Sequence, residues 1–270
     1  MKTHRVAVFS PNPCSLYTTT VCELLLRQGV FITGIFVRRF TWARFRQEFR
    51  RDGSRLLRKI WTKLVLRERA YAADEADNIV AFRRAQHLSA SSVADLHRQH
   101  GVKIISCATL NDAVVENQLR ENPPDLVVFT GGGIVRPNIL AVAGAGVVNC
   151  HSGILPEYRG MDVVEWALLK GERDQLGCTV HFMDQGLDTG DILRVEKIRV
   201  IPGDTLTRLR GRIESRMPEA IVGAAIDYLE GKRPRTPQAP NAGRQYFIMH
   251  PALRARAEAK LRTPPAGPAN

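Results

Sequence analysis

The sequence predicts an α/β protein with a Rossmann-like, mostly parallel sheet flanked by helices, and three observations support this prediction. An apolar run at 4–10, a helical pattern at 21–29 and a second apolar run at 30–37 follow one another in the order of a βαβ unit. A second series of alternating strand and helix patterns begins at 102. The 270 residues, 44% hydrophobic and 24% charged, suffice for a sizeable core with an appendage.

The later elements are expected in a regular order. Strands are predicted at 102–107, 125–132, 146–151, 179–184 and 192–201. The first three are continuous apolar runs, which is typical of buried parallel strands, whereas the last alternates and indicates an edge or hairpin strand. A long helix is expected over 204–231, with Asp204 as its N-cap, Gly231 as its end and a kink or break at Pro218.

The segment 40–69 interrupts this α/β order. Its aromatic and aliphatic residues recur at helical spacing, which predicts an inserted basic amphipathic helix, broken at Gly53. The formal net charge is +12, and residues 38–69 contain twelve basic and three acidic side chains. A helix packed on its own domain would explain this pattern, and so would contact with an anionic membrane surface or another anionic partner. Both alternatives stay open.

We expect a main domain over 1–231, which includes the basic insertion, and a short C-terminal extension over 232–270. The extension is rich in Pro, Ala and Arg, so part of it is expected to be disordered. Residues 245–261 are too apolar for a solvated tail and are expected to pack on the sheet or on a second subunit. No apolar run reaches the ~18 residues of a membrane-spanning helix, and the five cysteines are widely spaced. A cytoplasmic protein with reduced thiols is predicted.

Candidate catalytic side chains follow the strand at 146–151. Asn149 and His151 share one face of this strand, at the carboxyl end where α/β proteins bind ligands. An amide and an imidazole suit acyl transfer, because both can hydrogen-bond a carbonyl oxygen as it gains negative charge. The Gly-flanked loop at 186–191 supplies a third group, either Asp188 or Asp191.

Other chemistries are less favoured by the pattern. Cys150 faces away from His151 by alternation, and no GxSxG elbow is present, so we expect direct attack by the substrate rather than a covalent acyl-enzyme. The His, Cys and Asp spacings fit no common zinc template, so no metal is predicted. His181 fits an assisting role and a hydrogen-bonded interior role equally well.

Three separated pieces resemble the folate-dependent formyltransferases. They are Asn149-x-His151, LPEYRG at 155–160 and GCTVHFMDQGLDTGDIL at 177–193, in family order within roughly 102–205. The resemblance implies the formyltransferase fold, N10-formyltetrahydrofolate as donor and an amine that attacks the formyl carbon. It implies that Asn149 and protonated His151 stabilise the oxyanion. Asp188 would then hold the His in the required ionisation state and help to remove the proton from the amine.

The resemblance also implies a folate pocket along the loop TGGGIVRPN and the loop around GLDTGD. The residues it points to are Gly132, Gly133, Ile134, Val135, Asp184, Gly186 and Leu187. Glycines there would permit close approach of the pterin, although a simple strand-ending turn would also explain the Gly run.

The stretch YRGMDVVEWALLKGE at 158–172 most resembles sugar N-formyltransferases. It implies an acceptor site that contains Arg159, Gly160, Asp162, Glu165 and Trp166. We therefore expect the small-molecule amine acceptor to be a nucleotide-linked or lipid-linked amino sugar. A buried Trp and solvent-facing helix acids are the structural alternatives at these positions.

Several other functions are weighed against this expectation. The first βα turn, SPNPCSLYT, has no Gly-rich phosphate loop, which disfavours a glycinamide ribonucleotide enzyme. A methionyl-tRNA-type or other small-amine enzyme stays as an alternative, although few residues follow Gly231, and nucleic-acid binding is disfavoured without being excluded. A second alternative is a non-catalytic adaptor that binds polyanions or the inner membrane face through 40–69. A homodimer through the C-terminal part is a further expectation.

Overall fold

The computed structural model describes residues 3–39 and 77–261. The basic helix predicted at 40–69 and the first part of the interval 70–90 lie outside the described residues. Within the described ranges, no helix is both long and apolar enough to cross a bilayer.

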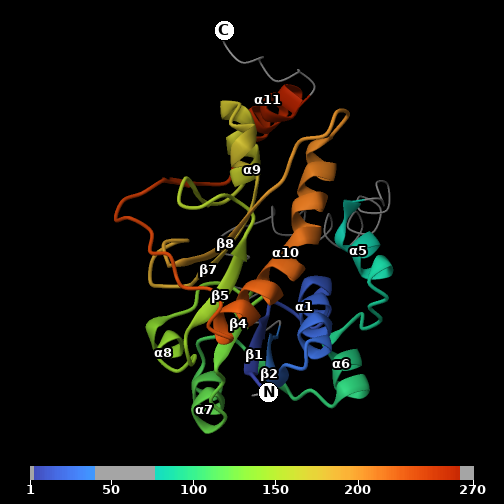
Figure 1. The fold of residues 1–270 in the computed structure, drawn as a ribbon, viewed down its shortest axis with the longest axis vertical. Coiled ribbons are helices and arrows are strands. Elements are labelled where there is room, and N and C mark those ends of the chain that lie inside the picture. The colour runs from blue at the N-terminus through green and yellow to red at the C-terminus, as the bar shows by residue number, and fades with distance from the viewer. Residues whose placement is uncertain (1–2, 40–76, 262–270) are drawn as a thin grey trace.

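A seven-stranded sheet forms the centre of the protein (Figure 1). Its strand order is β3-β2-β1-β4-β5-β7-β8. The strands are β1 (Arg5–Ser10), β2 (Phe31–Arg38), β3 (Ile104–Cys107), β4 (Leu126–Phe129), β5 (Val147–His151), β7 (Gly177–Phe182) and β8 (Ile192–Lys197). Pairs from β3 to β5 are parallel, while β7 and β8 are antiparallel, with β8 at the edge. The predicted mostly parallel α/β fold is therefore confirmed.

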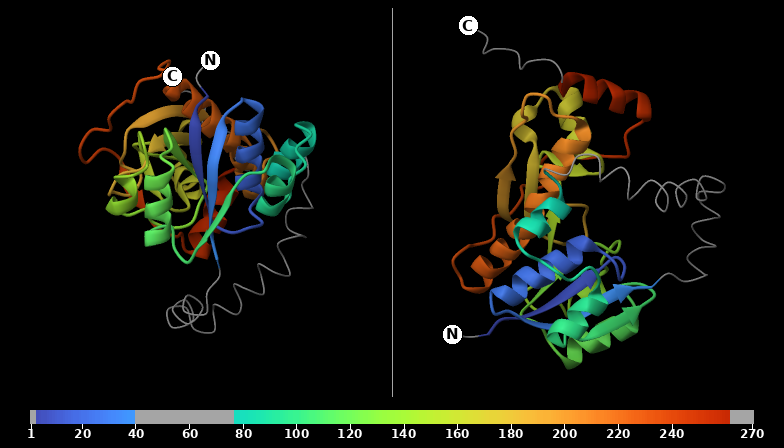
Figure 2. Two further views of the ribbon diagram at one scale, coloured as in Figure 1. Left: turned by 90° about the horizontal axis from the view of Figure 1, so that it is seen from below. Right: turned by 90° about the vertical axis from the view of Figure 1, so that its right-hand side faces the viewer.

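Helices cover both faces of this sheet (Figure 2). They are α1 (Leu16–Arg27), α5 (Ile79–Ala85), α6 (Val93–His100), α7 (Ala113–Glu121), α8 (Pro137–Leu140), α9 (Val163–Lys170), α10 (Leu206–Leu229) and α11 (Pro251–Leu261), with a 3-10 turn at Arg173–Gln175. Val6 and Val8 of β1 pack into the core under α1, α6 and α10, whereas Ala7 and Phe9 pack into the core under α7 and α8. This alternation is the reason why the strand reads as continuously apolar.

The predicted break at Pro218 is wrong, because α10 runs unbroken through this residue. A proline inside a helix removes one hydrogen bond and costs about 3 kcal/mol. Here Pro218 is itself buried, and the helix packs on α1, β5 and β7 with apolar residues buried on both sides of the proline, such as Ile213 and Ile221. Tertiary burial offsets the local defect.

The predicted start of this helix also needs correction. The N-cap is Thr205, whose hydroxyl accepts a hydrogen bond from the Arg208 amide at 3.1 Å. Asp204 instead accepts from the Ile201 amide at 2.7 Å and pairs with Arg212. Its carboxylate therefore closes the preceding turn rather than capping the helix.

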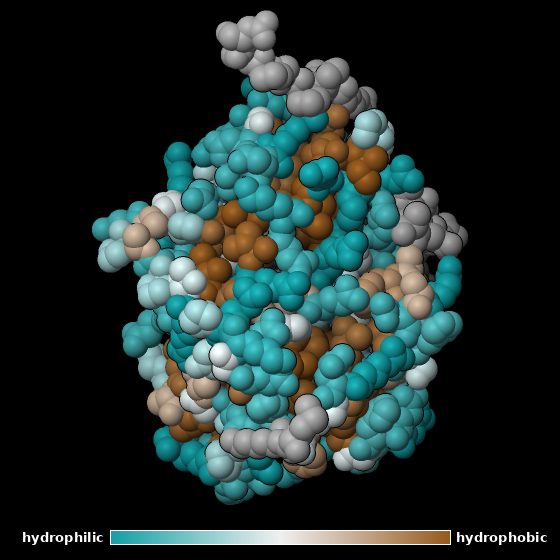
Figure 3. Space-filling view, in the orientation of Figure 1, coloured by the Kyte–Doolittle hydropathy of each residue, from teal (hydrophilic) through white to brown (hydrophobic). Residues whose placement is uncertain are grey.

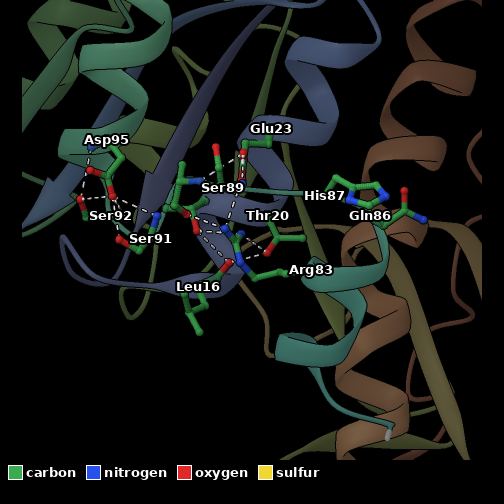
Figure 4. Close-up of polar contacts among 12 residues, drawn as sticks. Leu16, Thr20, Glu23, Arg83, Gln86, His87, Ser89, Ser91, Ser92 and Asp95 are labelled. Carbon is green, nitrogen blue, oxygen red and sulfur yellow. Dashed lines mark hydrogen bonds and ion pairs between the residues drawn. The ribbon is translucent and has the colours of Figure 1, made fainter. Parts of the chain in front are cut away.

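The chain that re-enters the described region at 77 is anchored to α1 by a buried polar cluster (Figure 4). Arg83 of α5 donates to the Thr20 hydroxyl at 2.8 Å and to Glu23 at 3.2 Å. Glu23 also accepts the backbone N–H of Ser89 at 2.8 Å. Both charged side chains are buried, so each satisfies hydrogen-bonding groups that water cannot reach.

The C-terminal extension folds back onto the main domain. Its strand β9 (Arg244–Tyr246) pairs in parallel with β6 (Tyr158–Gly160), and α11 packs on α9. This pairing places the predicted apolar stretch 245–261 against the same chain. Figure 3 shows a mostly hydrophilic surface that is interrupted by hydrophobic side chains in both halves, including the upper half, where α9 and α11 lie.

Candidate active site

The side chains of Asn149 and His181 meet at the carboxyl end of β5. The two residues are direct cross-strand partners of β5 and β7. The Asn149 Nδ2 atom lies 3.2 Å from His181 Nε2. Cys150, between Asn149 and His151, is buried in the opposite core beneath α10, as the alternation predicted. The register of one antiparallel pair therefore brings the amide and an imidazole together.

Asp188 joins these side chains from the loop after β7, with a left-handed backbone at φ +56°. Its Oδ2 atom accepts the Gly160 N–H at 2.9 Å and lies 3.5 Å from His151 Nδ1. Its Oδ1 atom lies 3.6 Å from His181 Nε2. The carboxylate thus contacts both imidazoles and a backbone amide of β6. Asp191, the alternative from the residue pattern, has no side-chain contact of this kind among the described residues.

His151 is placed between two hydrogen-bond acceptors and is 7% exposed. Its Nε2 atom lies 2.8 Å from the Tyr158 carbonyl oxygen, and its Nδ1 atom faces the Asp188 carboxylate. A neutral imidazole carries one N–H and can donate to only one of them. The ring therefore has an acceptor oxygen near each of its two nitrogens.

His181 has the opposite environment, which fixes a neutral tautomer. Its Nδ1 atom lies 2.8 Å from the Phe182 carbonyl oxygen, an acceptor, so this nitrogen carries the proton. The Nε2 atom is then free to accept from Asn149. Burial lowers the pKa of His181 from its ordinary value of 6.5, and the nearby Asp188 charge opposes this effect. The ring therefore holds the Asn149 amide with its N–H₂ group toward the cluster.

The lowered pKa of His181 predicts a loss of stability at acidic pH. The unfolded chain takes up this proton more readily than the folded chain, so the free energy of unfolding falls as the pH drops below about 6.5. Urea unfolding at pH 7.5 and at pH 5 should show a smaller difference for His181→Gln than for the wild type. His100→Gln, at an exposed position, is the control and should keep the wild-type difference. Equal pH dependence in all three proteins would contradict the assignment.

The glycine loop follows β4, whose Phe129 pairs with Asn149. Gly132 and Gly133 have φ values of +131° and +102°. A Cβ on Gly132 would collide with Leu110, and one on Gly133 would lie 3.3 Å from Arg38. Side chains of Leu110 and Arg38 therefore lie where a Cβ would project from these two glycines.

The other predicted pocket residues fall into two groups. Ile134 and Leu187 are large apolar side chains that are 80% and 46% exposed. Val135 is buried in the core under α7, so only its backbone faces the loop. The Asp184 carboxylate accepts the Gly186 N–H at 2.9 Å and the Thr189 hydroxyl at 2.7 Å, which closes the loop that carries Asp188.

The predicted acceptor residues of α9 hold the C-terminal extension. Asp162 accepts the Met249 N–H at 2.9 Å, and the Trp166 indole donates to the Phe247 carbonyl at 2.9 Å. Neither contact was expected from the sequence, because the extension lies more than eighty residues further along the chain.

Glu165 is engaged inside the protein, an arrangement that the sequence did not predict. Its side chain is fully buried and pairs with Arg210 at 2.7 Å and with Arg254 of α11. Burial by itself would favour the neutral acid, but the two guanidiniums lower the pKa of Glu165 below its ordinary value. The carboxylate joins α9, α10 and α11. Arg159 is partly buried next to this region, and Gly160 faces Asp188.

The fold is one that the sequence comparisons assign to a known family. The family model described as "Formyl transferase" matches residues 67–225, and the chain belongs to this family. Among curated proteins, the methionyl-tRNA formyltransferase of Ruminiclostridium cellulolyticum is 31% identical over 156 residues, which are 57% of this chain and 50% of that protein. That of Anaeromyxobacter dehalogenans is 35% identical over 142 residues, 52% of this chain and 45% of that protein. The chain thus spans about half the length of the curated relatives it matches.

Solved structures show the same fold at low identity. A sugar N-formyltransferase from a Shewanella species has a TM-score of 0.58 at 12% identity, covering 96% of this chain and 88% of that one. Glycinamide ribonucleotide transformylase 1 from Symbiobacterium toebii has a TM-score of 0.56 at 19% identity, covering 85% of this chain and 89% of that one.

His181 and the Tyr158 carbonyl also belong to the cluster, although the sequence did not assign either of them a site role. The sequence signal for His181 was its position on a strand that faces the crevice. Nothing in the sequence pointed to the Tyr158 carbonyl, because every residue has a backbone carbonyl and residue type does not show which one lies in a site. Within the described residues, no group of three or more His, Cys, Asp or Glu is arranged to hold a metal ion.

Proposed function

We propose that this protein transfers a formyl group from N10-formyltetrahydrofolate to an amine by direct attack. The observation that carries the proposal is the contact of Asp188 with both His151 and His181, the second of which holds Asn149. Membership of the formyl transferase family supports the donor class.

Each side chain of the cluster has a role that follows from its contacts. The donor supplies an activated formyl carbon. The Asn149 N–H₂ group donates one hydrogen bond to His181 and has its second N–H for an oxygen that gains negative charge. Protonated His151 adds a positive charge to the same region, and Asp188 stabilises that charge. Asp188 is also the group that, directly or through water, takes the proton from the attacking amine. The bond between the formyl carbon and N10 then breaks, and the proton goes to N10 of the departing tetrahydrofolate.

The residues around the glycine loop suit the flat ring system of a folate. Ile134 and Leu187 offer exposed apolar surface for its faces. Backbone groups of 132–135 and of the loop at 184–187 offer polar contacts for its edges. The loop begins directly after Phe129, the cross-strand partner of Asn149, so it adjoins the catalytic cluster.

For the acceptor, we propose a nucleotide-linked or lipid-linked amino sugar. Sugar N-formyltransferases are among the proteins that share the fold, and one from Helicobacter canadensis is described in complex with folinic acid and dTDP-3-aminofucose. The methionyl-tRNA enzymes among the relatives make a methionyl-tRNA-type acceptor the second candidate. Membrane contact through 40–69, a cytoplasmic location and a homodimer stay proposals of the same kind.

Titration calorimetry with 5-formyltetrahydrofolate, a stable analogue of the donor, tests the donor class. We expect saturable binding by the wild type. Asp174→Asn changes an exposed acid outside the cluster and should bind equally well. A folded protein that shows no binding would remove the folate proposal and favour the polyanion or membrane adaptor. If the wild type binds the folate, assays of formyl transfer to amino-sugar nucleotides and to methionyl-tRNA identify the acceptor.

A further inference from the structure

The β6–β9 pair has one buried and one exposed face. Tyr158 and Tyr246 turn toward the core and stack with ring centroids 5.0 Å apart. Because strand residues alternate, Arg159 and Met161 of the first chain segment and Phe247 of the second lie on the other face. Met161, Phe247 and the adjacent Ile248 are 54%, 68% and 69% exposed. We call Arg159, Met161 and Phe247 the extension face.

The backbone under this face is held in place. The Met161 N–H donates to the Tyr246 carbonyl at 3.0 Å, and the Trp166 indole N–H donates to the Phe247 carbonyl at 2.9 Å. The Phe247 ring is therefore presented to solvent from a fixed main chain. A large apolar side chain fixed in this way loses little conformational freedom on binding, which favours its use as a contact residue.

Arg159 adds a positive charge to the same face. Its guanidinium makes no hydrogen bond or ion pair to any residue of the described ranges, and its Nε atom is shielded from solvent. A partly buried charge without a counter-ion is unfavourable, so an anion at this position would be stabilised by it.

The extension face adjoins the catalytic cluster through Gly160. The N–H of this residue, between Arg159 and Met161, donates to Asp188 at 2.9 Å. Along its opposite edge, β6 pairs with β9. One short strand therefore contacts both the catalytic cluster and the C-terminal extension. A ligand whose amine reaches Asp188 would extend over this face.

We propose that the extension face binds the nucleoside diphosphate part of the acceptor, with Arg159 on the phosphates and the base stacked on Phe247. This rests on the proposed function, since the face matters for catalysis only if an amine is presented to the cluster. Phosphates match the unpaired guanidinium, and a base matches an exposed aromatic ring. The proposal makes Phe247 a specificity-determining residue that lies in the C-terminal extension.

Titration calorimetry with uridine 5′-diphosphate and, separately, with inorganic pyrophosphate tests this assignment. Phe247→Ala should weaken binding of the nucleotide about five- to a hundredfold, as expected for the loss of one stacking contact, and leave pyrophosphate unchanged. Arg159→Gln should weaken both ligands. Phe31→Ala removes an aromatic ring that is 52% exposed at the start of β2 and should change neither.

The outcomes separate this proposal from the proposed function. Binding of 5-formyltetrahydrofolate without binding of uridine 5′-diphosphate would overturn the nucleotide site and keep the donor. Unchanged nucleotide affinity in Phe247→Ala would also overturn it. If Phe247→Ala converts a dimer into a monomer by light scattering and leaves nucleotide affinity unchanged, the face is an interface between two copies of the chain. Absence of folate binding would instead contradict the proposed function.

Discussion

Asp188→Asn is expected to lower kcat/KM for formyl transfer by about 10²–10⁴-fold, the range for loss of a positioned acid–base group. The substitution keeps an oxygen that can accept the Gly160 N–H but removes the charge that faces both imidazoles. The loss should therefore appear in kcat with little change in the urea midpoint. Steady-state kinetics with the identified acceptor, together with urea unfolding, measure both quantities.

Asp191→Asn is the matched control for this prediction. Asp191 lies in the same Gly-flanked loop, three residues away, and its carboxylate makes no hydrogen bond or ion pair to the described residues. We expect near wild-type kinetics. If the two substitutions had equal effects on kcat, the role assigned to Asp188 would be wrong.

Gly160→Ala is expected to destabilise the fold and to abolish most activity. Gly160 has a φ of +98°, and a Cβ there would collide with the carbonyl oxygen of Tyr246. Backbone strain of about 1–3 kcal/mol and overpacking of about 1–3 kcal/mol would add, so we expect a loss of about 2–6 kcal/mol. The displaced strand would also carry the Gly160 N–H away from Asp188. Urea unfolding and kinetics measure the two effects.

Gly203→Ala separates strain from collision. Gly203 has a φ of +84°, but a Cβ at this position would meet nothing within 4 Å. It should show the cost of strain alone and keep its activity. A Gly160→Ala protein as stable and as active as Gly203→Ala would show that the β6–β9 contact has no part in holding the cluster.

The elements with strong local patterns were predicted well. The β5 run ends at His151 as expected, and its alternation placed Cys150 in the opposite core. Where local pattern and packing disagreed, packing prevailed. The helix α1 starts at Leu16 rather than near 21, because Ser15 caps it and three consecutive threonines, poor helix formers, are buried in its first turns. Pro218 stays helical for the same kind of reason.

The predicted acceptor residues show what residue type and spacing alone cannot decide. The sequence placed Asp162, Glu165 and Trp166 near an acceptor, whereas the structure uses their polar groups to hold the C-terminal extension. Residue type alone could not distinguish these roles, because a carboxylate can serve a ligand or an Arg equally well. The partner was a segment more than eighty residues away.

The sequence by itself determined the α/β class, the strand that carries Asn149 and His151, and the loop that carries Asp188. These depend on periodicity and turn chemistry, which act between neighbours in the chain. Only the tertiary structure decided that His181 holds Asn149 and that Asp188 reaches both imidazoles. It also decided that β9 pairs with β6, the strand next to this cluster. Such contacts join residues that are far apart in sequence, and burial decides both their geometry and the protonation of His181.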